Sequence, residues 1–280
     1  MECEICGNSL NSTIFLNRSA LNCNFCKYNK TVENEKNSKE LKEKYKSDFW
    51  SQEKLEDMIL TNFSNKQGRD YKLAQESMYE YCRKFIPSQG RILEIGVGTG
   101  VHLINFDKLG YQVTGIEPDL LSTEFLNKTL KNGKCINGYI EDLDFEKKFD
   151  VVFLYHVVEH LEHPLLMLKK CKDLLKNDGI IIIAVPDCEN PETLEKSVTN
   201  PFHIWHFSKK SFEILGEKLK MHSLSLESFT RVSTNSRRIH LILRKANLSF
   251  ITRKNNPHFP LTPTDKNNGY EIRLVLKNKF

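Results

Sequence analysis

The sequence predicts an α/β protein built on a doubly wound, mostly parallel sheet that ends in an antiparallel hairpin. Apolar runs alternate with helical patterns, as expected for strands buried on both faces of a parallel sheet. A glycine-rich turn follows the first run, and two C-x-x-C pairs stand ahead of all of them. The predicted units are a small cysteine-rich unit over 1–30, a linker and helical cap over 31–89, the main domain over 90–245 and a C-terminal extension over 246–280.

Bulk composition is that of an ordinary soluble protein. Hydrophobic residues make up 39% and charged residues 28% of the 280-residue chain, and the mean hydropathy is −0.47. No apolar run approaches the roughly 20 residues that span a bilayer, and the first residues lack the regions of a secretory signal. We expect a cytoplasmic protein with no membrane partner. The net charge of +5 allows an anionic substrate, such as a nucleotide-linked sugar or RNA, without requiring one.

Four cysteines near the N-terminus have the spacing of a structural zinc site. Cys3 and Cys6 form one C-x-x-C pair, Cys23 and Cys26 form the other, and sixteen residues separate the pairs. Each pair can place two thiolates on one ion, and so small a unit needs the ion to fold. A redox role is the rival interpretation, but no strand–helix unit surrounds either pair. We predict a zinc-ribbon-like unit with structural Zn²⁺, and we expect the remaining cysteines to pack among apolar residues: Cys82, Cys135, Cys171 and Cys188.

The segment over 31–89 begins polar and then takes on a helical pattern. Its first part has almost no apolar content, so it reads as a linker that runs into a solvated helix. Apolar residues then recur at helical spacing, among them Met78, Tyr81, Cys82 and Phe85, and Pro87 closes the pattern. We expect two or three helices that pack on the main domain.

Four apolar runs predict the parallel strands of the main domain: RILEIGV, YQVTGIEP, FDVVFLY and GIIIIAVP. Between the last two runs, a helical pattern begins at Pro164 and is expected to end at Gly179. Ser208 is the expected N-cap of a later helix. The stretches HSLSLESFTRV and RRIHLILRK then predict a strand pair. In the extension, YEIRLVLKNKF alternates as an edge strand does.

The turn LEIGVGTG joins the first strand to a helix and predicts a nucleotide-binding loop. Its glycines, Gly96, Gly98 and Gly100, allow a tight turn and let a ligand lie against the backbone. The pattern is G-x-G-x-G. It differs from the G-x-G-x-x-G pattern of dinucleotide sites, because Val101 stands where that pattern has its last glycine. Glu117 ends the next strand, seventeen residues beyond Gly100, where an acid can accept hydrogen bonds from both hydroxyls of a ribose.

Five segments together resemble the class I S-adenosylmethionine-dependent methyltransferases, a Rossmann-like family. They occur in the family's order, with spacing that fits one domain from Gly90 to about Lys245. The segments are LEIGVGTG from its acid onward, GIEPD, GYIEDLDF, FDVVFLYHVVEHLEHP and LLKNDGIIIIAVPD. A four-cysteine unit ahead of such a domain resembles methyltransferases of sugar, surface-polysaccharide and secondary-metabolite pathways.

The resemblance implies the residues that hold S-adenosylmethionine. Glu94 would orient the amino-acid end of the cofactor, and Glu117 would hold its ribose. Ile140 and Glu141 would flank the adenine. The full implied set is Arg69, Glu94, Gly96, Gly98, Gly100, Glu117, Ile140, Glu141 and His156.

Two members of this set and one departure need comment. His156 would lie nearest the transferred methyl group. Arg69 matches an upstream arginine that in many relatives pairs with the cofactor carboxylate. Tyr139 stands where the family often has Asp, so Glu141 or Asp142 is the expected substitute.

The string HVVEH, His156 to His160, reads literally as the H-x-x-E-H motif of inverzincin metalloproteases. In that motif, two histidines on one helical face bind zinc and the glutamate acts as base. Here the string follows a buried strand, at the edge where open α/β sheets bind their ligands. We therefore interpret it as part of a methyltransferase site.

The same string leaves a cation or a general base as alternatives. His156, Glu159 and His160 would share one face if a helix begins near His156, and NPFHIWHFS brings His203 and His206 to the same cleft. Ubiquinone-pathway O-methyltransferases and small-RNA 3′-end methyltransferases look similar here and hold a divalent cation with an acid-x-x-Glu-His motif. We favour a metal-free interpretation in which His160 is a structural or hydrogen-bonding residue, and in which His156 or His206 could serve as the general base. The candidate catalytic residues are His156, Glu159, His160 and His206.

The function that we expect is methyl transfer from S-adenosylmethionine to a hydroxyl of a sugar, nucleotide-linked sugar or related small metabolite. One alternative is an RNA methyltransferase that uses a His/Glu-bound divalent cation. Another is a non-catalytic scaffold whose zinc ribbon binds a partner, although the intact glycine loop argues against it. We expect a monomer or homodimer, with a small-molecule or glycan acceptor.

Overall fold

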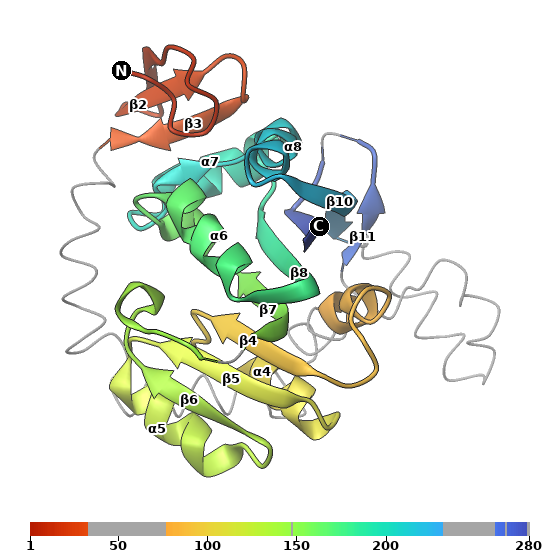
Figure 1. Ribbon diagram of the computed structural model, residues 1–280. Helices are drawn as coiled ribbons and strands as arrows, with labels where there is room; N and C mark the ends of the chain where they lie inside the picture. The colour runs from red at the N-terminus through yellow and green to blue at the C-terminus, as the bar shows by residue number, and fades with distance from the viewer. Residues whose placement is uncertain (33–76, 147, 232–260, 267, 279–280) are drawn as a thin grey trace, which may run out of the picture.

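The computed structural model describes residues 1–32, 77–146, 148–231, 261–266 and 268–278 (Figure 1). Within these residues the chain forms an eight-stranded sheet and a four-stranded sheet. Three predicted features lie outside the described residues: Arg69, most of the helical cap and the strand RRIHLILRK.

Five parallel strands form one half of the larger sheet, as the apolar runs predict. Adjacent strands pair in parallel throughout this half. In spatial order they are β6 (Gly133–Asn137), β5 (Gln112–Glu117), β4 (Arg91–Ile95), β7 (Phe149–Tyr155) and β8 (Leu175–Pro186).

Both faces of this sheet are buried, which explains the continuous apolar runs. Side chains of successive strand residues point to opposite faces, so in β8 Ile181 and Ile183 join one core cluster while Ile180 and Ile182 join the other. Helices cover the two faces (Figure 1): α4 (Val101–Lys108), α5 (Leu120–Thr129), α6 (Pro164–Asp173), α7 (Pro191–Thr199) and α8 (Lys209–Lys218). None of the described helices is long and apolar enough to cross a membrane.

Helix ends follow local chemistry in two places and depart from prediction in a third. Ser208 caps α8 through a reciprocal capping box with Ser211, as predicted. Asp119 caps α5 by accepting the Ser122 N–H at 2.7 Å. The predicted end of α6 at Gly179 is wrong. The helix ends at Asp173 because Leu175 already pairs with Phe149 in the sheet.

The antiparallel end of the sheet is confirmed, and three described strands form it, of which the first coincides with the predicted strand HSLSLESFTRV. They are β10 (Met221–Arg231), β11 (Leu261–Thr264) and β12 (Glu271–Asn278). β12 lies between β8 and β10 and pairs antiparallel with both. The stretch expected to be an edge strand is therefore an interior strand with its first six residues buried. The sheet thus extends beyond the predicted domain end at 245.

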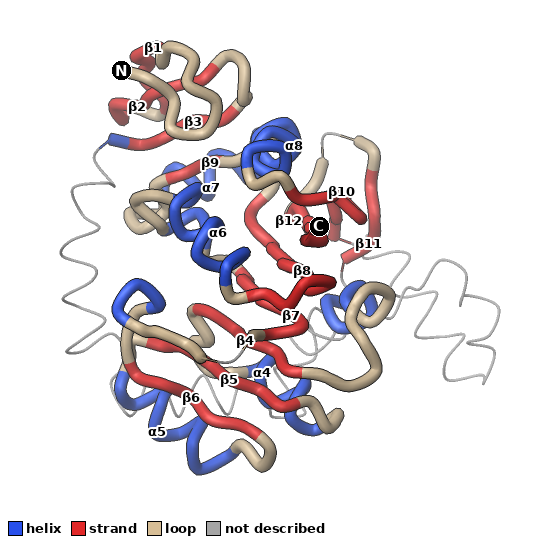
Figure 2. The backbone as a smooth tube through the Cα atoms, viewed as in Figure 1, coloured by secondary structure: helices blue, strands red, loops and turns tan. Residues whose placement is uncertain are grey.

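The cysteine-rich unit, which we call the ribbon (residues 1–32), forms the smaller sheet together with one strand of the main domain. Its strands are β1 (Asn11–Phe15), β2 (Arg18–Cys23) and β3 (Tyr28–Thr31). β3 pairs antiparallel with β9 (Trp205–His206), and Figure 2 shows β9 beside the ribbon. Ribbon and main-domain side chains share one core cluster, in which the rings of Tyr28 and Trp205 lie 4.9 Å apart. The ribbon is therefore packed against the main domain.

Candidate active site

The glycine loop after β4 has the backbone geometry that only glycine adopts freely. Gly96, Gly98 and Gly100 have φ angles of 68°, 55° and 77°. A Cβ on Gly96 would come within 2.6 Å of the Val157 side chain, and one on Gly100 within 2.0 Å of Leu126. These two positions exclude larger residues by close packing as well as by conformation.

Glu117, at the end of β5, is tied to this loop. Its Oε2 accepts the Gly98 N–H at 2.7 Å, and its Oε1 accepts the Asp119 N–H at 3.0 Å. Burial raises the pKa of Glu117 to about 7, although both backbone hydrogen bonds favour the charged form. The carboxyl therefore changes charge near neutral pH.

A cavity of about 920 Å³ opens at the carboxyl ends of the parallel strands. This volume lies within the range of roughly 300–1,000 Å³ found for small-molecule sites. Six of the predicted cofactor-binding residues line it: Gly96, Gly98, Glu117, Ile140, Glu141 and His156. Gly100 and Glu94 are not among the lining residues.

Glu94 lies buried in β4, and its Oε2 has no hydrogen-bond partner among the described residues. Burial, together with the neighbouring Glu117, raises the pKa of Glu94 well above its ordinary value. A buried carboxyl oxygen without a partner is costly, so a ligand group that donates an N–H or O–H would suit it. This observation agrees with a role toward the amino-acid end of a cofactor.

His156 follows β7 and is held between two buried carboxylates. Its Nδ1 donates to Oε1 of Glu159 at 3.1 Å and its Nε2 donates to Oε2 of Glu271 at 3.0 Å. Burial alone lowers the pKa of His156, but the hydrogen bonds and charges of the two carboxylates outweigh it and raise the pKa to about 10. His156 is therefore a cation at neutral pH, and the prediction that it acts as a general base is wrong for this geometry.

The expected helix at HVVEH is also shorter than predicted. His156 has a φ of 53°, outside any helix, and only a 3₁₀ turn, η2 (Val158–His160), follows. The backbone N–H of His156 donates to Ala184 O at 2.8 Å, which anchors this turn to β8. His156 and Glu159 meet through their side chains, without sharing a helical face.

The partner of His156 comes from β12 and is itself paired. Arg273 Nε donates to Oε1 of Glu271 at 2.6 Å, and both side chains are fully buried. Burial opposes ionisation of Glu271, but Arg273 and His156 lower its pKa to about 2. The Arg273 guanidinium also lies 4.1 Å from the centre of the Phe229 ring. We call His156, Glu159, Glu271 and Arg273 the ion cluster.

His160 presents a different nitrogen to the cavity. Its Nδ1 lies 2.8 Å from Phe202 O, and a carbonyl oxygen only accepts, so Nδ1 carries a proton. A neutral ring with this proton on Nδ1 holds a lone pair on Nε2, and His160 is one of the residues that line the cavity.

Glu159, His160 and His203 bring one carboxylate oxygen and two ring nitrogens within 4.8 Å of one another. Glu159 is fully buried, and its Oε2 has no hydrogen-bond partner among the described residues. One carboxylate and two imidazoles suit a divalent transition-metal ion. The predicted cation set is therefore only partly assembled, since His203 stands where His156 and His206 were expected.

His206 lies away from the cavity, between the ribbon and α7. Its Nε2 is 2.6 Å from Thr31 Oγ1 and its Nδ1 is 2.9 Å from Ser197 Oγ. Burial lowers the pKa of His206 to about 3 and that of His203 to about 4, so both rings are neutral. His206 does not line the cavity, and the prediction that it is the general base is therefore wrong.

The four ribbon cysteines converge on one point. The Cys3 and Cys26 sulfurs lie 3.7 Å apart, the Cys6 and Cys23 sulfurs lie 3.6 Å apart, and all four lie within 4.8 Å of one another. Backbone N–H groups of Cys6 and Cys26 point at the Cys3 and Cys23 sulfurs at 3.4 and 3.3 Å. Such N–H groups stabilise thiolates, so the arrangement suits a tetrahedral ion.

Sequence reasoning missed Glu271, Arg273, Thr31 and Ser197. A signal was present for the first two, because YEIRLVLKNKF places Glu271 and Arg273 on one face of a strand whose neighbouring residues are mostly apolar. Thr31 and Ser197 carry no such signal. Their hydroxyls matter only because the fold brings β3, β9 and α7 together.

Comparison with known proteins agrees with the geometry. A family model described as a methyltransferase domain matches residues 66–220, more than half of the chain. Ubiquinone biosynthesis O-methyltransferase of Bradyrhizobium sp. (strain ORS 278) is 31% identical over 115 residues, which cover 37% of this chain and 46% of that protein. The enzyme of the same name from Rhodopseudomonas palustris (strain TIE-1) is 33% identical over 100 residues, 34% of this chain and 39% of that protein. The matched region thus spans less than half of either relative.

Solved structures show the same fold at low identity. A SAM-dependent methyltransferase from Archaeoglobus fulgidus has a TM-score of 0.56 at 18% identity, covering 79% of this chain and 99% of that one. The plantazolicin methyltransferase in complex with SAH has a TM-score of 0.53 at 19% identity, covering 88% and 99%. Coclaurine N-methyltransferase bound to N-methylheliamine and SAH has a TM-score of 0.57 at 14% identity, covering 88% and 87%.

Proposed function

The chain belongs to the class I S-adenosylmethionine-dependent methyltransferases, and we propose that its acceptor is a hydroxyl of a sugar, nucleotide-linked sugar or related small metabolite. Two observations support a hydroxyl acceptor. The curated relatives are named as O-methyltransferases, and a histidine with a lone pair faces the cavity.

The cofactor fits the residues at one end of the cavity. Glu117 would accept hydrogen bonds from the ribose hydroxyls, and Gly96 and Gly98 would lie against the cofactor without a side chain between. Ile140 and Glu141, on η1 (Ile140–Asp142), would border the adenine. When bound, S-adenosylmethionine supplies an electrophilic methyl group on its sulfonium sulfur.

His160 is the observation that carries the hydroxyl assignment. Its Nδ1–H donates to Phe202 O, which fixes the ring and leaves Nε2 as an acceptor in the cavity. His156 cannot fill this role because both of its nitrogens already donate to carboxylates. His160 Nε2 would take the proton of the acceptor hydroxyl as that oxygen attacks, and the bound cofactor would supply the methyl group.

A methyl-transfer assay tests this assignment. Radiolabelled S-adenosylmethionine is offered with hexoses, nucleotide-linked sugars and catechols, each beside a matched amine. His160→Gln should lower kcat by roughly 10²–10⁴-fold, the usual contribution of a general base, with the affinity for S-adenosylmethionine unchanged. His222→Gln, on the exposed part of β10, is the control. Transfer to amines only, or full activity of His160→Gln, would contradict the proposal.

A divalent cation is the second candidate, favoured by the unpartnered Oε2 of Glu159 beside His160 and His203. A cation there would bind and acidify the acceptor hydroxyl. Metal analysis of the purified chain and of His203→Ala tests it, and a cation that is lost together with activity would support it. The RNA variant of this candidate requires oligonucleotide binding that weakens steeply with salt.

We also propose that the ribbon holds one structural Zn²⁺. For Zn–S bonds of about 2.3 Å, tetrahedral geometry places the sulfurs about 3.8 Å apart, close to the separations of 3.6 and 3.7 Å. Zinc should be present at one per chain and absent from Cys3→Ser, which should lose the fold of the ribbon. A zinc-free chain with a folded ribbon would contradict this. The non-catalytic scaffold is excluded if S-adenosylmethionine binds and is turned over.

A further inference from the structure

We propose that Thr31 of the ribbon acts through His206 and Ser197 as a positioning relay that decides which nitrogen of His203 carries the proton. The relay would hold His203 with an N–H, rather than a lone pair, on Nε2. This inference deepens the proposed function, because His203 adjoins His160, the proposed base.

The relay is a continuous chain of three hydrogen bonds across three elements. Thr31 Oγ1 on β3 lies 2.6 Å from His206 Nε2 on β9. His206 Nδ1 lies 2.9 Å from Ser197 Oγ on α7, and the same oxygen lies 2.9 Å from His203 Nδ1. His203 then stands in the cluster with Glu159 and His160.

Counting hydrogens gives the chain a direction. Among the described residues, the one hydrogen-bond partner of the fully buried Thr31 hydroxyl is His206 Nε2. A buried hydroxyl gives its hydrogen to the acceptor it has, so Thr31 donates and Nε2 of His206 accepts. The single hydrogen of the neutral His206 ring is then on Nδ1 and is donated to Ser197 Oγ.

The same count continues to the active site. Ser197 Oγ accepts from His206, so its own hydrogen is left for another acceptor; the Cys188 thiol also adjoins Ser197, but sulfur is a weak acceptor, and Nδ1 of His203 at 2.9 Å takes the hydrogen. The hydrogen of the neutral His203 ring must then be on Nε2. In the reverse direction, the Thr31 hydrogen would have no acceptor among the described residues, which costs about 1–3 kcal/mol for a buried group.

The direction of the hydrogen bonds matters because it distinguishes the two candidate mechanisms, a metal-free histidine base and a bound divalent cation. An Nε2–H can donate toward the unpartnered Oε2 of Glu159, but a protonated nitrogen cannot bind a metal ion. The relay therefore disfavours a cation at Glu159, His160 and His203. It also gives the ribbon a role in the site, since Thr31 is held there by its N–H to Ile204 O at 2.9 Å.

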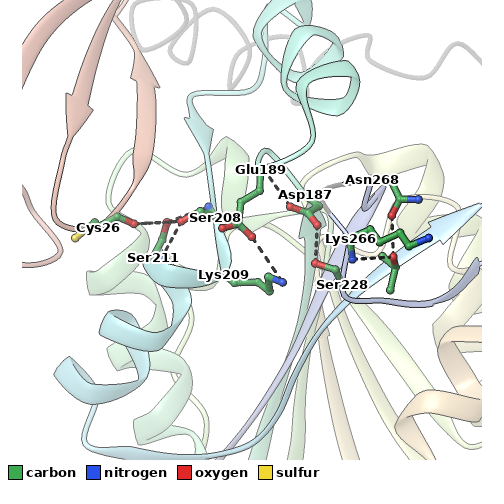
Figure 3. Close-up of polar contacts among 10 residues, drawn as sticks. Cys26, Asp187, Glu189, Ser208, Lys209, Ser211, Ser228, Lys266 and Asn268 are labelled. Atoms are coloured by element: carbon green, nitrogen blue, oxygen red, sulfur yellow. Dashed lines mark hydrogen bonds and ion pairs between the residues drawn. The ribbon is translucent and has the colours of Figure 1, made fainter.

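The ribbon is anchored firmly enough to serve this role. Ser208 and Ser211, at the start of α8, donate to Cys26 O at 3.2 and 3.1 Å (Figure 3). Because Cys26 is one of the four clustered cysteines, the metal site and the relay belong to one packed unit.

Long-range ¹H–¹⁵N NMR of the histidine rings in the full-length protein tests the relay directly. Wild type should show His206 protonated at Nδ1 and His203 protonated at Nε2. Thr31→Val keeps the shape but has no hydrogen to donate, so the ring signals of both histidines should change. Thr31→Ser, which keeps the hydroxyl, and Thr13→Val, on the exposed strand β1 of the ribbon, should leave both patterns as in wild type. His203 protonated at Nδ1 in wild type, or a His203 ring unchanged by Thr31→Val, would overturn the proposal.

Mn²⁺ binding supplies a readout that does not depend on activity. Thr31→Val should bind Mn²⁺ at least several-fold more tightly than wild type, and His203→Gln in the same background should abolish the gain. Equal Mn²⁺ affinity in wild type and Thr31→Val would overturn the relay. Calorimetry with S-adenosylmethionine distinguishes failure of the relay from failure of the proposed function. If wild type does not bind S-adenosylmethionine, the proposed function is contradicted, but the protonation pattern of the histidine rings still tests the relay.

Discussion

His156 and His206 illustrate two opposite ways in which a protein buries an imidazole. His156 meets Glu159 and Glu271 and is held as a cation, with its pKa raised to about 10. Among the described residues, the His206 side chain hydrogen-bonds to the hydroxyls of Thr31 and Ser197, and burial lowers its pKa to about 3. The ring is the same, so the neighbours alone decide its charge.

The difference shows how the two ends of the chain contribute to the site. β12 supplies the carboxylate and the guanidinium of the ion cluster, whereas the ribbon supplies a hydroxyl to the neutral relay. Neither histidine is left to accept a proton from a substrate. His160, which lies between these two supports in the sequence and lines the cavity, keeps a lone pair for that purpose.

Removing a charge from the ion cluster should have the largest effect of the substitutions proposed, and it should lower the free energy of unfolding. Glu271→Gln leaves Arg273 and His156 buried without their shared counter-ion, and we expect a loss of about 3–5 kcal/mol in the free energy of unfolding. Urea denaturation measures it. Glu213→Gln breaks an exposed pair with Lys210 on α8 and should cost less than about 1 kcal/mol. Similar losses for the two variants would mean that the ion cluster contributes little.

Glu117 extends the comparison to a buried carboxyl that, within the described part of the chain, is held by backbone N–H groups and not by a cation. Glu117→Gln should weaken S-adenosylmethionine binding by roughly 10–100-fold, the equivalent of one or two hydrogen bonds to a charged group. In wild type the affinity should also fall as the pH drops below about 7, because protonation removes an acceptor. Calorimetry at several pH values measures both effects, with Glu124→Gln on exposed α5 as control. A pH-independent affinity would remove Glu117 from the site.

The two histidines should also give stability opposite dependences on pH. The pKa of His156 is raised above its ordinary 6.5, so its contribution is complete below 6.5 and is lost as the pH rises through about 10. The pKa of His206 is depressed, so its contribution is complete above 6.5 and is lost as the pH falls through about 3.

Each histidine can change the slope of the unfolding free energy against pH by up to about 1.4 kcal/mol per pH unit. His156→Gln should therefore flatten the alkaline side of a stability profile measured by urea denaturation, and His206→Gln should flatten the acid side. If the two variants change the same side, the assigned charge states are wrong.

The smallest expected effect concerns the contact between the ribbon and the main domain. Ser208→Ala removes both the N-cap of α8 and one donor to Cys26 O. We expect a loss of about 0.5–2 kcal/mol in the free energy of unfolding. Ser223→Ala, on the exposed part of β10, should have no measurable effect. A null result for Ser208→Ala would show that α8 does not depend on this contact.

The parallel half of the fold and the cofactor end of the site could be predicted because their signals are local. The glycines of the loop, Glu117 at a strand end and the continuous apolar run of β8 each follow from short-range rules. The place of β12 could not be predicted, because an interior antiparallel strand and an edge strand both alternate. What separates them is pairing with β8 and β10, which lie far away in the sequence.

The roles of the histidines depend even more on distant partners. HVVEH places His156 correctly beside the cavity, but its charge comes from Glu271, 115 residues away, as well as from Glu159 within the string. His206 was expected in the cleft because it shares a segment with His203. Thr31, 175 residues away, binds it at the ribbon instead. Titratable groups take their function from neighbours, and the sequence does not reveal those neighbours.

We expect His156 to be permanently charged and His206 permanently neutral in the working range of pH. ¹⁵N NMR of the histidine side chains between about pH 5.5 and 8.5 tests it most directly. Both nitrogens of His156 should stay protonated across this range, and His206 should keep one protonated and one unprotonated nitrogen. Titration of both rings together near their ordinary pKa of 6.5 would contradict it.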